Sequence, residues 1–116
     1  MDECIFCKIA AGDIKSDIVY EDEKVIAFKD INPAAPVHLL VIPRKHVPSL
    51  LEIGEEDKEL IGHIHLVLQK LARDFKIDRS GFRVINNCGK DSGQAVFHLH
   101  FHLLGGRPLP QNLGGQ

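Results

Sequence analysis

The segment from His98 to Leu104 constrains the fold of this chain more than any other part of the sequence. It reads His-Leu-His-Phe-His-Leu-Leu, so histidine alternates with a large apolar residue. Because side chains on a β-strand point alternately to opposite faces, this alternation predicts a strand with one apolar face and one face of three imidazoles. We predict that this last strand runs from Val96 to Leu104.

Shorter patterns predict the other strands of a sheet. Two segments rich in β-branched and aromatic residues, at residues 18–21 and 25–28, are joined by charged residues, which is typical of a β-hairpin. A buried strand is predicted at residues 38–42, where Pro43 ends the apolar run, and a further strand at residues 82–86.

One long amphipathic helix is predicted at residues 55–75. Its apolar residues recur every three or four positions and therefore share one face: Leu60, Ile61, Ile64, Val67, Leu68, Leu71, Ala72 and Phe75. Gly62 inside the helix costs about 1 kcal/mol relative to alanine, which suggests that a neighbouring group packs closely there. With a short helix at residues 4–10, we expect one α+β domain over residues 1–116, with an antiparallel sheet of about five strands.

The bulk composition is that of an ordinary globular protein, with 44% hydrophobic and 26% charged residues. The formal net charge of −2 gives no electrostatic reason to expect nucleic acid or an anionic membrane as a partner. An odd number of cysteines argues against a closed disulfide framework, and the first residues resemble no secretory signal. No apolar run reaches the roughly 20 residues that a membrane-spanning helix needs. We therefore expect a cytoplasmic protein.

Three interpretations of the histidine row have to be weighed. A solvated polar face would be served equally well by serine or threonine, and an imidazole is costly to desolvate without a partner. A single metal ion bound by all three is opposed by distance, because His98 and His102 lie roughly 13 Å apart on a strand. Catalysis fits best, since imidazole is a competent nucleophile toward phosphorus and its neighbours can donate to phosphate oxygens.

The histidine row is similar to the signature of the histidine triad (HIT) family, in which three histidines alternate with hydrophobic residues. Further blocks resemble, in the correct order, the Hint-like branch, whose members are similar to purine nucleoside phosphoramidases: Ile5-Phe6, residues 27–33 (Ala-Phe-Lys-Asp-Ile-Asn-Pro), residues 35–38 (Ala-Pro-Val-His), residues 41–43 (Val-Ile-Pro) and residues 103–107 (Leu-Leu-Gly-Gly-Arg). The resemblance implies the HIT-like fold and a homodimer.

In that family the middle histidine attacks the α-phosphorus of a nucleotide, and water then releases the nucleoside monophosphate. The resemblance implies that His100 is the nucleophile, that His102 contacts phosphate oxygens and that His38 helps to move protons beside them. His98 completes the triad. The implied activity is cleavage of a purine nucleoside 5′-monophosphate, above all AMP, from an amine or another leaving group, without a catalytic metal. Hydrolysis of dinucleoside polyphosphates, or nucleotide binding by an adaptor with little turnover, are the alternatives.

The resemblance also assigns residues to the nucleotide. Asn87 and Gln94 match positions on its phosphate and ribose side, and Asp30 matches a carboxylate that accepts bonds from the ribose hydroxyls. The apolar slot for the purine is matched by Phe6, Ile9, Phe28 and Ile31. One position departs from the family, because Ala95 stands where a hydroxyl residue often interacts with the leaving group. We expect the leaving-group preference to depend on this change and the role of His100 to survive it.

The pair Cys4 and Cys7 has C-x-x-C spacing, which by itself allows several interpretations. A redox dithiol lacks a thioredoxin-like context, two incidental buried thiols are as reasonable, and a zinc site needs two more ligands. Relatives with this pair often bind a structural zinc ion, and the resemblance implies His46 and His98 as its other ligands. Such a site would staple the N-terminus to the sheet. The remaining notable residues are interpreted as structural: His63, His65, Asn86 and Cys88.

Overall fold

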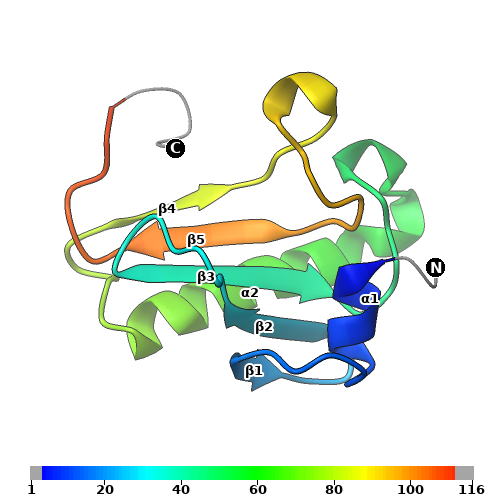
Figure 1. Ribbon diagram of the computed structural model, residues 1–116, viewed down its shortest axis with the longest axis horizontal. Helices are drawn as coiled ribbons and strands as arrows, with labels where there is room; N and C mark the ends of the chain where they lie inside the picture. The colour runs from blue at the N-terminus through cyan, green and yellow to red at the C-terminus, as the bar shows by residue number, and fades with distance from the viewer. Residues whose placement is uncertain (1–3, 112–116) are drawn as a thin grey trace.

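The predicted sheet is present. In the computed structural model, which describes residues 4–111, a five-stranded sheet has the strand order β1-β2-β3-β5-β4 (Figure 1). Each neighbouring pair of strands is antiparallel. The elements are α1 (Ile5–Ala10), β1 (Ile18–Glu21), β2 (Val25–Lys29), β3 (Val37–Pro43), α2 (Lys58–Asp74), β4 (Phe82–Ile85) and β5 (Phe101–Gly105). The α+β fold with one long and one short helix is therefore confirmed.

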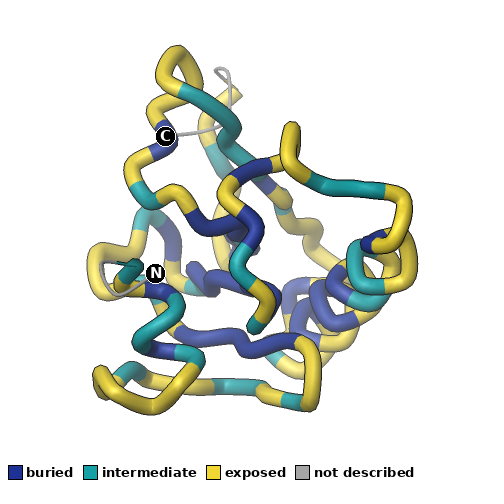
Figure 2. Tube along the Cα trace, turned by 90° about the vertical axis from the view of Figure 1, so that its right-hand side faces the viewer, coloured by how far each residue is buried: buried dark blue, intermediate teal, exposed yellow. Residues whose placement is uncertain are grey.

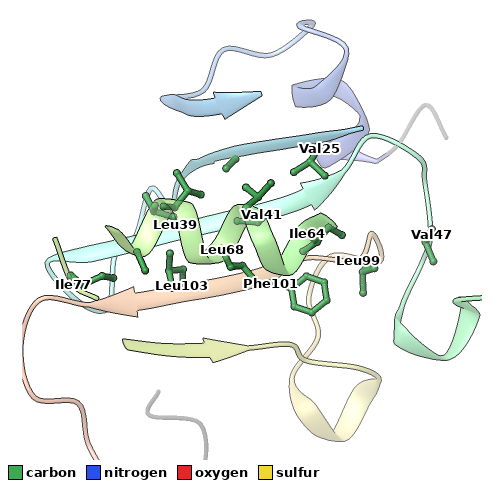
Figure 3. Close-up of a cluster of buried hydrophobic side chains, with 14 residues drawn as sticks. Val25, Leu39, Val41, Val47, Ile64, Leu68, Ile77, Leu99, Phe101 and Leu103 are labelled. Atoms are coloured by element: carbon green, nitrogen blue, oxygen red, sulfur yellow. The ribbon is translucent and has the colours of Figure 1, made fainter. Parts of the chain in front are cut away.

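The two helices cover opposite faces of the sheet. Helix α2 lies along one face, where Ile64 and Leu68 pack among alternate residues of the central strands such as Val41 and Leu103 (Figure 3). Helix α1 lies on the other face, where its Phe6 and Ile9 side chains pack on sheet residues that point away from α2. These sheet residues are Ile26, Phe28, Leu40 and Ile42. Each large side chain that becomes fully buried contributes about 1.5–3 kcal/mol. Figure 2 shows the buried positions gathered in the inner strands and along one side of α2.

The hairpin of β1 and β2 is tied to α2 by one carboxylate. Asp22 accepts hydrogen bonds from the backbone of Lys24 and Val25, both at 2.8 Å. Its other oxygen lies 2.6 Å from the Tyr20 hydroxyl and 2.6 Å from His63 Nε2. Burial would raise the pKa of Asp22, but these hydrogen bonds outweigh it and hold the pKa well below its usual range. His63 therefore joins the long helix to the hairpin turn.

Three local expectations need correction. The long helix begins as a 3₁₀ turn at Glu55–Asp57, because the Asp57 carboxylate accepts a bond from the Gly54 N–H at 3.0 Å and tightens this turn. Nothing packs against Gly62, which is exposed and has no neighbour within 4 Å of an added Cβ. The last strand begins at Phe101 and not at Val96.

The late start of β5 has a visible cause. The ladder between β3 and β5 ends with Val41 opposite Phe101. Beyond that pair the Leu99 N–H bonds to Val47 O at 2.6 Å, and the His98 ring bonds to Pro43 O at 2.8 Å. The Leu99 N–H and the Pro43 carbonyl, two main-chain groups that could continue the ladder, are therefore engaged elsewhere. No helix in the described part of the chain is both long enough and apolar enough to cross a bilayer.

Replacing Gly62 with alanine should raise the free energy of unfolding by about 0.5–1 kcal/mol, because the new methyl group meets no neighbour and the unfolded chain loses freedom. Urea titration followed by circular dichroism measures this change. Gly105→Ala is the matched control and should destabilise, since its Cβ would lie 2.8 Å from Ile77 Cδ1. A lower midpoint for Gly62→Ala would contradict the prediction.

Candidate active site and metal-ligand cluster

The three histidines of the row lie on one side of their segment even though only His102 is within β5. Leu99, Phe101 and Leu103 belong to the core beneath α2. The imidazoles therefore project to the opposite face, which α1 partly covers. Burial of the alternate apolar residues fixes this arrangement, because a shift by one residue would place histidines in the core.

A cavity of about 260 Å³ opens on this face. It brings together six of the residues that the sequence assigned to the nucleotide or the reaction: Phe6, Asp30, Asn87, Gln94, His100 and His102. Four further residues line it, Leu40, Gly93, Ala95 and Val96, of which Leu40 and Val96 were not expected. Leu40 could have been found, because it shares a strand face with His38 two positions earlier. Ala95, the departure from the family pattern, therefore lies within the site.

Several expected residues do not line this cavity. Ile9 and Phe28 are buried in the cluster beneath Phe6, and Ile31 is 89% exposed. Gln94 does line the cavity, but its amide is occupied by the chain itself. Its oxygen accepts from the Gly89 N–H at 2.8 Å, and its nitrogen donates to the carbonyls of Pro48 and Val96. The Gln94 side chain thus holds the loop that forms one wall.

His100 is held as a neutral base with one free nitrogen. Its Nδ1 lies 2.7 Å from the His98 carbonyl, which can only accept, so Nδ1 carries the proton. The unprotonated Nε2 has no hydrogen-bond partner among residues 4–111. Burial lowers the pKa of His100, so the ring is uncharged at neutral pH. The Phe6 ring meets it edge to face, with 5.1 Å between ring centroids.

A second pair of rings, those of His38 and His102, lies beside His100. The Ala34 N–H donates to His38 Nδ1 at 3.0 Å, so the neutral His38 ring carries its proton on Nε2. That Nε2 donates to His102 Nδ1 at 2.9 Å, which places the His102 proton on its own Nε2. Asp30 Oδ2 lies 3.4 Å from His38 Nε2. The result is a hydrogen-bonded pair of rings in which His102 presents an N–H group.

Four side chains beneath α1 have the composition of a closed metal site. One ligand atom each of Cys4, Cys7, His46 and His98 lies within 4.8 Å of the others. The His98 Nε2–H donates to Pro43 O, which leaves the lone pair of Nδ1 facing the sulfurs of Cys4 and Cys7 at 3.3 and 3.4 Å. His46 Nδ1 is 3.2 Å from Cys7 Sγ. Two ligands on one tetrahedral zinc ion stand about 3.5 Å apart, so the four residues fit that geometry.

The Cys7 thiol stays protonated in the metal-free chain, so a bound cation would be needed to stabilise its thiolate. Burial and the neighbouring Cys4 raise the pKa of Cys7 to about 11. A second group of Asp30, His38 and His102 is equally close together, but a proton lies between its two rings. Its nitrogens already bond to each other and to Ala34, so the cysteine cluster is the better candidate for a metal-ligand set.

Comparisons with known proteins identify the family of the chain. A family model described as "Scavenger mRNA decapping enzyme C-term binding" matches residues 3–111. The purine nucleoside phosphoramidase of Escherichia coli (strain K12) is 44% identical over 108 residues, which cover 93% of this chain and 91% of the relative.

Solved structures give the same result. A histidine triad protein from Clostridium difficile has a TM-score of 0.93 and 54% identity, covering 97% of both chains. A HIT family hydrolase from Legionella pneumophila has a TM-score of 0.92 and 42% identity, covering 94% of this chain and 97% of that one. The chain belongs to the histidine triad family, as its motifs indicated, and is a hydrolase of that family.

Acid should weaken the fold through His102. Burial and the neighbouring His100 and His38 lower the pKa of His102 to about 4, whereas an unfolded histidine titrates near a pH of about 6.5. The unfolded chain therefore binds more protons between these values, and the free energy of unfolding falls as the pH drops through this window.

Urea titrations at a pH of about 6.5 and of about 4.5 measure the effect. His102→Gln cannot titrate and should lose less free energy of unfolding over this range than the wild type. Both proteins carry the same cysteine cluster, so its acid sensitivity cancels in the comparison. Parallel losses in the two proteins would show that His102 does not contribute.

Proposed function

We propose that the protein cleaves a purine nucleoside 5′-monophosphate, preferably AMP, from an amine or another leaving group by way of a nucleotidyl-histidine intermediate. One observation carries this proposal: neutral His100 lines the cavity with an unprotonated Nε2 that no described residue occupies. The relative from Escherichia coli named purine nucleoside phosphoramidase, at 44% identity, supports the same substrate class.

In the first step, the lone pair of His100 Nε2 attacks the α-phosphorus. A bond forms between nitrogen and phosphorus, and the bond from phosphorus to the leaving amine breaks with its electron pair on the amine. The leaving nitrogen takes up one proton from solvent, so the amine leaves neutral and the His38–His102 pair keeps both of its N–H groups. The positive charge on the His100 ring is stabilised by the His98 carbonyl, which accepts the Nδ1–H bond at 2.7 Å.

In the second step, water attacks the same phosphorus and the bond to His100 Nε2 breaks. The proton of the water is released to solvent, and the nucleoside monophosphate leaves. His102 Nε2–H donates to a non-bridging phosphate oxygen in both steps, so charge that develops on phosphorus meets a donor already in place. The depressed pKa of His102 keeps this ring from protonating fully, and its N–H stays a neutral donor.

The nucleotide would lie along the cavity wall. Asp30 accepts a hydrogen bond from the Asn32 N–H and retains lone pairs for the ribose hydroxyls. Asn87 faces the phosphate, and Phe6 contacts the purine. Ile31, next to Asp30 in sequence, has an exposed apolar side chain that the base would cover.

Replacing His100 with alanine should lower kcat for adenosine 5′-phosphoramidate at least about a thousandfold, because no other nucleophile replaces Nε2. AMP binding, followed by calorimetry, should persist. Mass spectrometry of wild type quenched in alkaline denaturant, which preserves a bond between phosphorus and histidine nitrogen, should show one adenylyl group on His100. His65→Ala is the control, since that ring is exposed and bonds to Ile61 O of its own helix.

Other outcomes identify the alternatives. Equal slow turnover by wild type and His100→Ala would support an adaptor that only binds nucleotides. A much higher kcat/KM for diadenosine polyphosphates than for the phosphoramidate would support a dinucleoside polyphosphate hydrolase.

We further propose that Cys4, Cys7, His46 and His98 hold a structural zinc ion. The ion would take both thiolates and the Nδ1 atoms of the two histidines, and it would bind α1 to the end of β3 and to the start of the histidine row. All four ligand positions are then filled by protein, so the site has no open position for catalysis.

Purified protein prepared without chelators should contain about one zinc ion per chain, and Cys4→Ser with Cys7→Ser should abolish it. The melting temperature should fall with the metal. Cys88→Ser is the matched control, because Cys88 is outside the cluster and should keep the full metal content. Metal-free wild-type protein with an unchanged melting temperature would contradict the proposal.

A homodimer in the cytoplasm completes the proposal. Strand β4 is an edge of the sheet in the described chain, and it exposes Phe82 and Val84 on one face. A second copy would cover these side chains and the unpaired edge. The three cysteines are free, which suits a reducing compartment. Light scattering that returns the mass of one chain would exclude the dimer.

A further inference from the structure

The nucleophile lies just beyond the end of the sheet, where regular strand bonds no longer hold it. Strand β4 pairs with β5 up to Ile85 opposite His102. At Asn86 the backbone no longer pairs with β5, and the Asn86 side chain makes the next hydrogen bond to that strand's chain instead. Its Nδ2 donates to the His100 carbonyl at 2.9 Å. We infer that Asn86 is a positioning residue that fixes the backbone of His100 by replacing the missing strand bond.

The orientation of the Asn86 amide is determined by its partner. A flipped amide would place Oδ1 against the carbonyl of His100, where two acceptors would repel each other. With Nδ2 on that carbonyl, Oδ1 is buried and has no hydrogen-bond partner among the described residues. Such an unsatisfied acceptor is unfavourable for the fold. Asn86 therefore adds little to the free energy of unfolding, and its main effect is on the position of His100, to whose carbonyl it donates.

Three contacts together set the position of the His100 ring. Asn86 donates a hydrogen bond to its backbone carbonyl, and the His98 carbonyl accepts one from its Nδ1–H. The Phe6 ring packs edge to face with the imidazole at a centroid distance of 5.1 Å. Nε2 has no such contact with the described chain, so its place depends on these other groups. A displacement of about 1 Å at a reacting atom can lower the rate on the order of a hundredfold.

The inference rests on the proposed role of His100, and two variants test it. Asn86→Leu has nearly the shape of asparagine but removes both the donor and the unsatisfied acceptor. Asn86→Asp keeps the shape and replaces the donor with an acceptor. We expect kcat for adenosine 5′-phosphoramidate to fall by about ten- to a hundredfold in both. The AMP dissociation constant should change by less than about twofold, because Asn86 does not line the cavity.

A second readout follows the ring itself. In the wild type, ¹⁵N chemical shifts of His100 should show a single tautomer with the proton on Nδ1, and in both variants the two tautomers should mix. Val67→Ala is the control for stability, because it opens the core beneath α2 and not the site. It should unfold at lower urea with kcat and the His100 spectrum unchanged. Asn86→Leu should show the reverse, with a urea midpoint close to wild type.

The outcomes separate the two hypotheses. If Asn86→Leu and Asn86→Asp keep the wild-type kcat and the single His100 tautomer, the positioning role is wrong. If wild type forms no adenylyl-histidine, the proposed function fails, and the ¹⁵N spectra still report whether Asn86 holds the ring.

Discussion

Burial of Leu99, Phe101 and Leu103 against helix α2 is the interaction on which the rest of the site depends. These side chains lie in the core and anchor β5 between β3 and β4. Because the strand period is two, the same burial sends His100 and His102 to the opposite face. The hydrophobic effect thus supplies the free energy that assembles three polar rings, each of which would be costly to bury by its own contacts alone.

Main-chain groups then decide what each ring can do. The His98 carbonyl accepts a hydrogen bond from His100 Nδ1–H, and the Pro43 carbonyl accepts one from His98 Nε2–H. The Ala34 N–H donates to His38 Nδ1. Each contact fixes one tautomer, so every ring has a defined donor and a defined lone pair. The same side-chain type therefore offers a free lone pair on His100, a lone pair on His98 that faces two sulfurs, and an N–H group on His102, all on one face of the sheet.

Much of the fold could be predicted from local patterns. The hairpin, the long helix and the histidine row depend on periodicity, which burial enforces directly. The start of β5 could not be predicted, because it depends on Val47 and Pro43, distant residues that capture the groups of His98 and Leu99. The apolar slot expected for the purine coincides only in part with the cavity lining. Its apolar residues divide between a buried cluster and the open surface, and sequence does not show which side of that boundary Phe28 or Ile31 occupies.

The alternating segment also limits how this region of the chain can change. A substitution at one position alters one face and leaves the other in place. Inserting or deleting a single residue between His98 and Leu103 would instead exchange the two faces for every residue that follows. Imidazoles would then enter the hydrophobic core, and leucine or phenylalanine would enter the cavity. The length of this stretch is thus fixed more rigidly than its composition, whereas the loop around Gly89, outside the sheet, has no such alternating faces to keep in register.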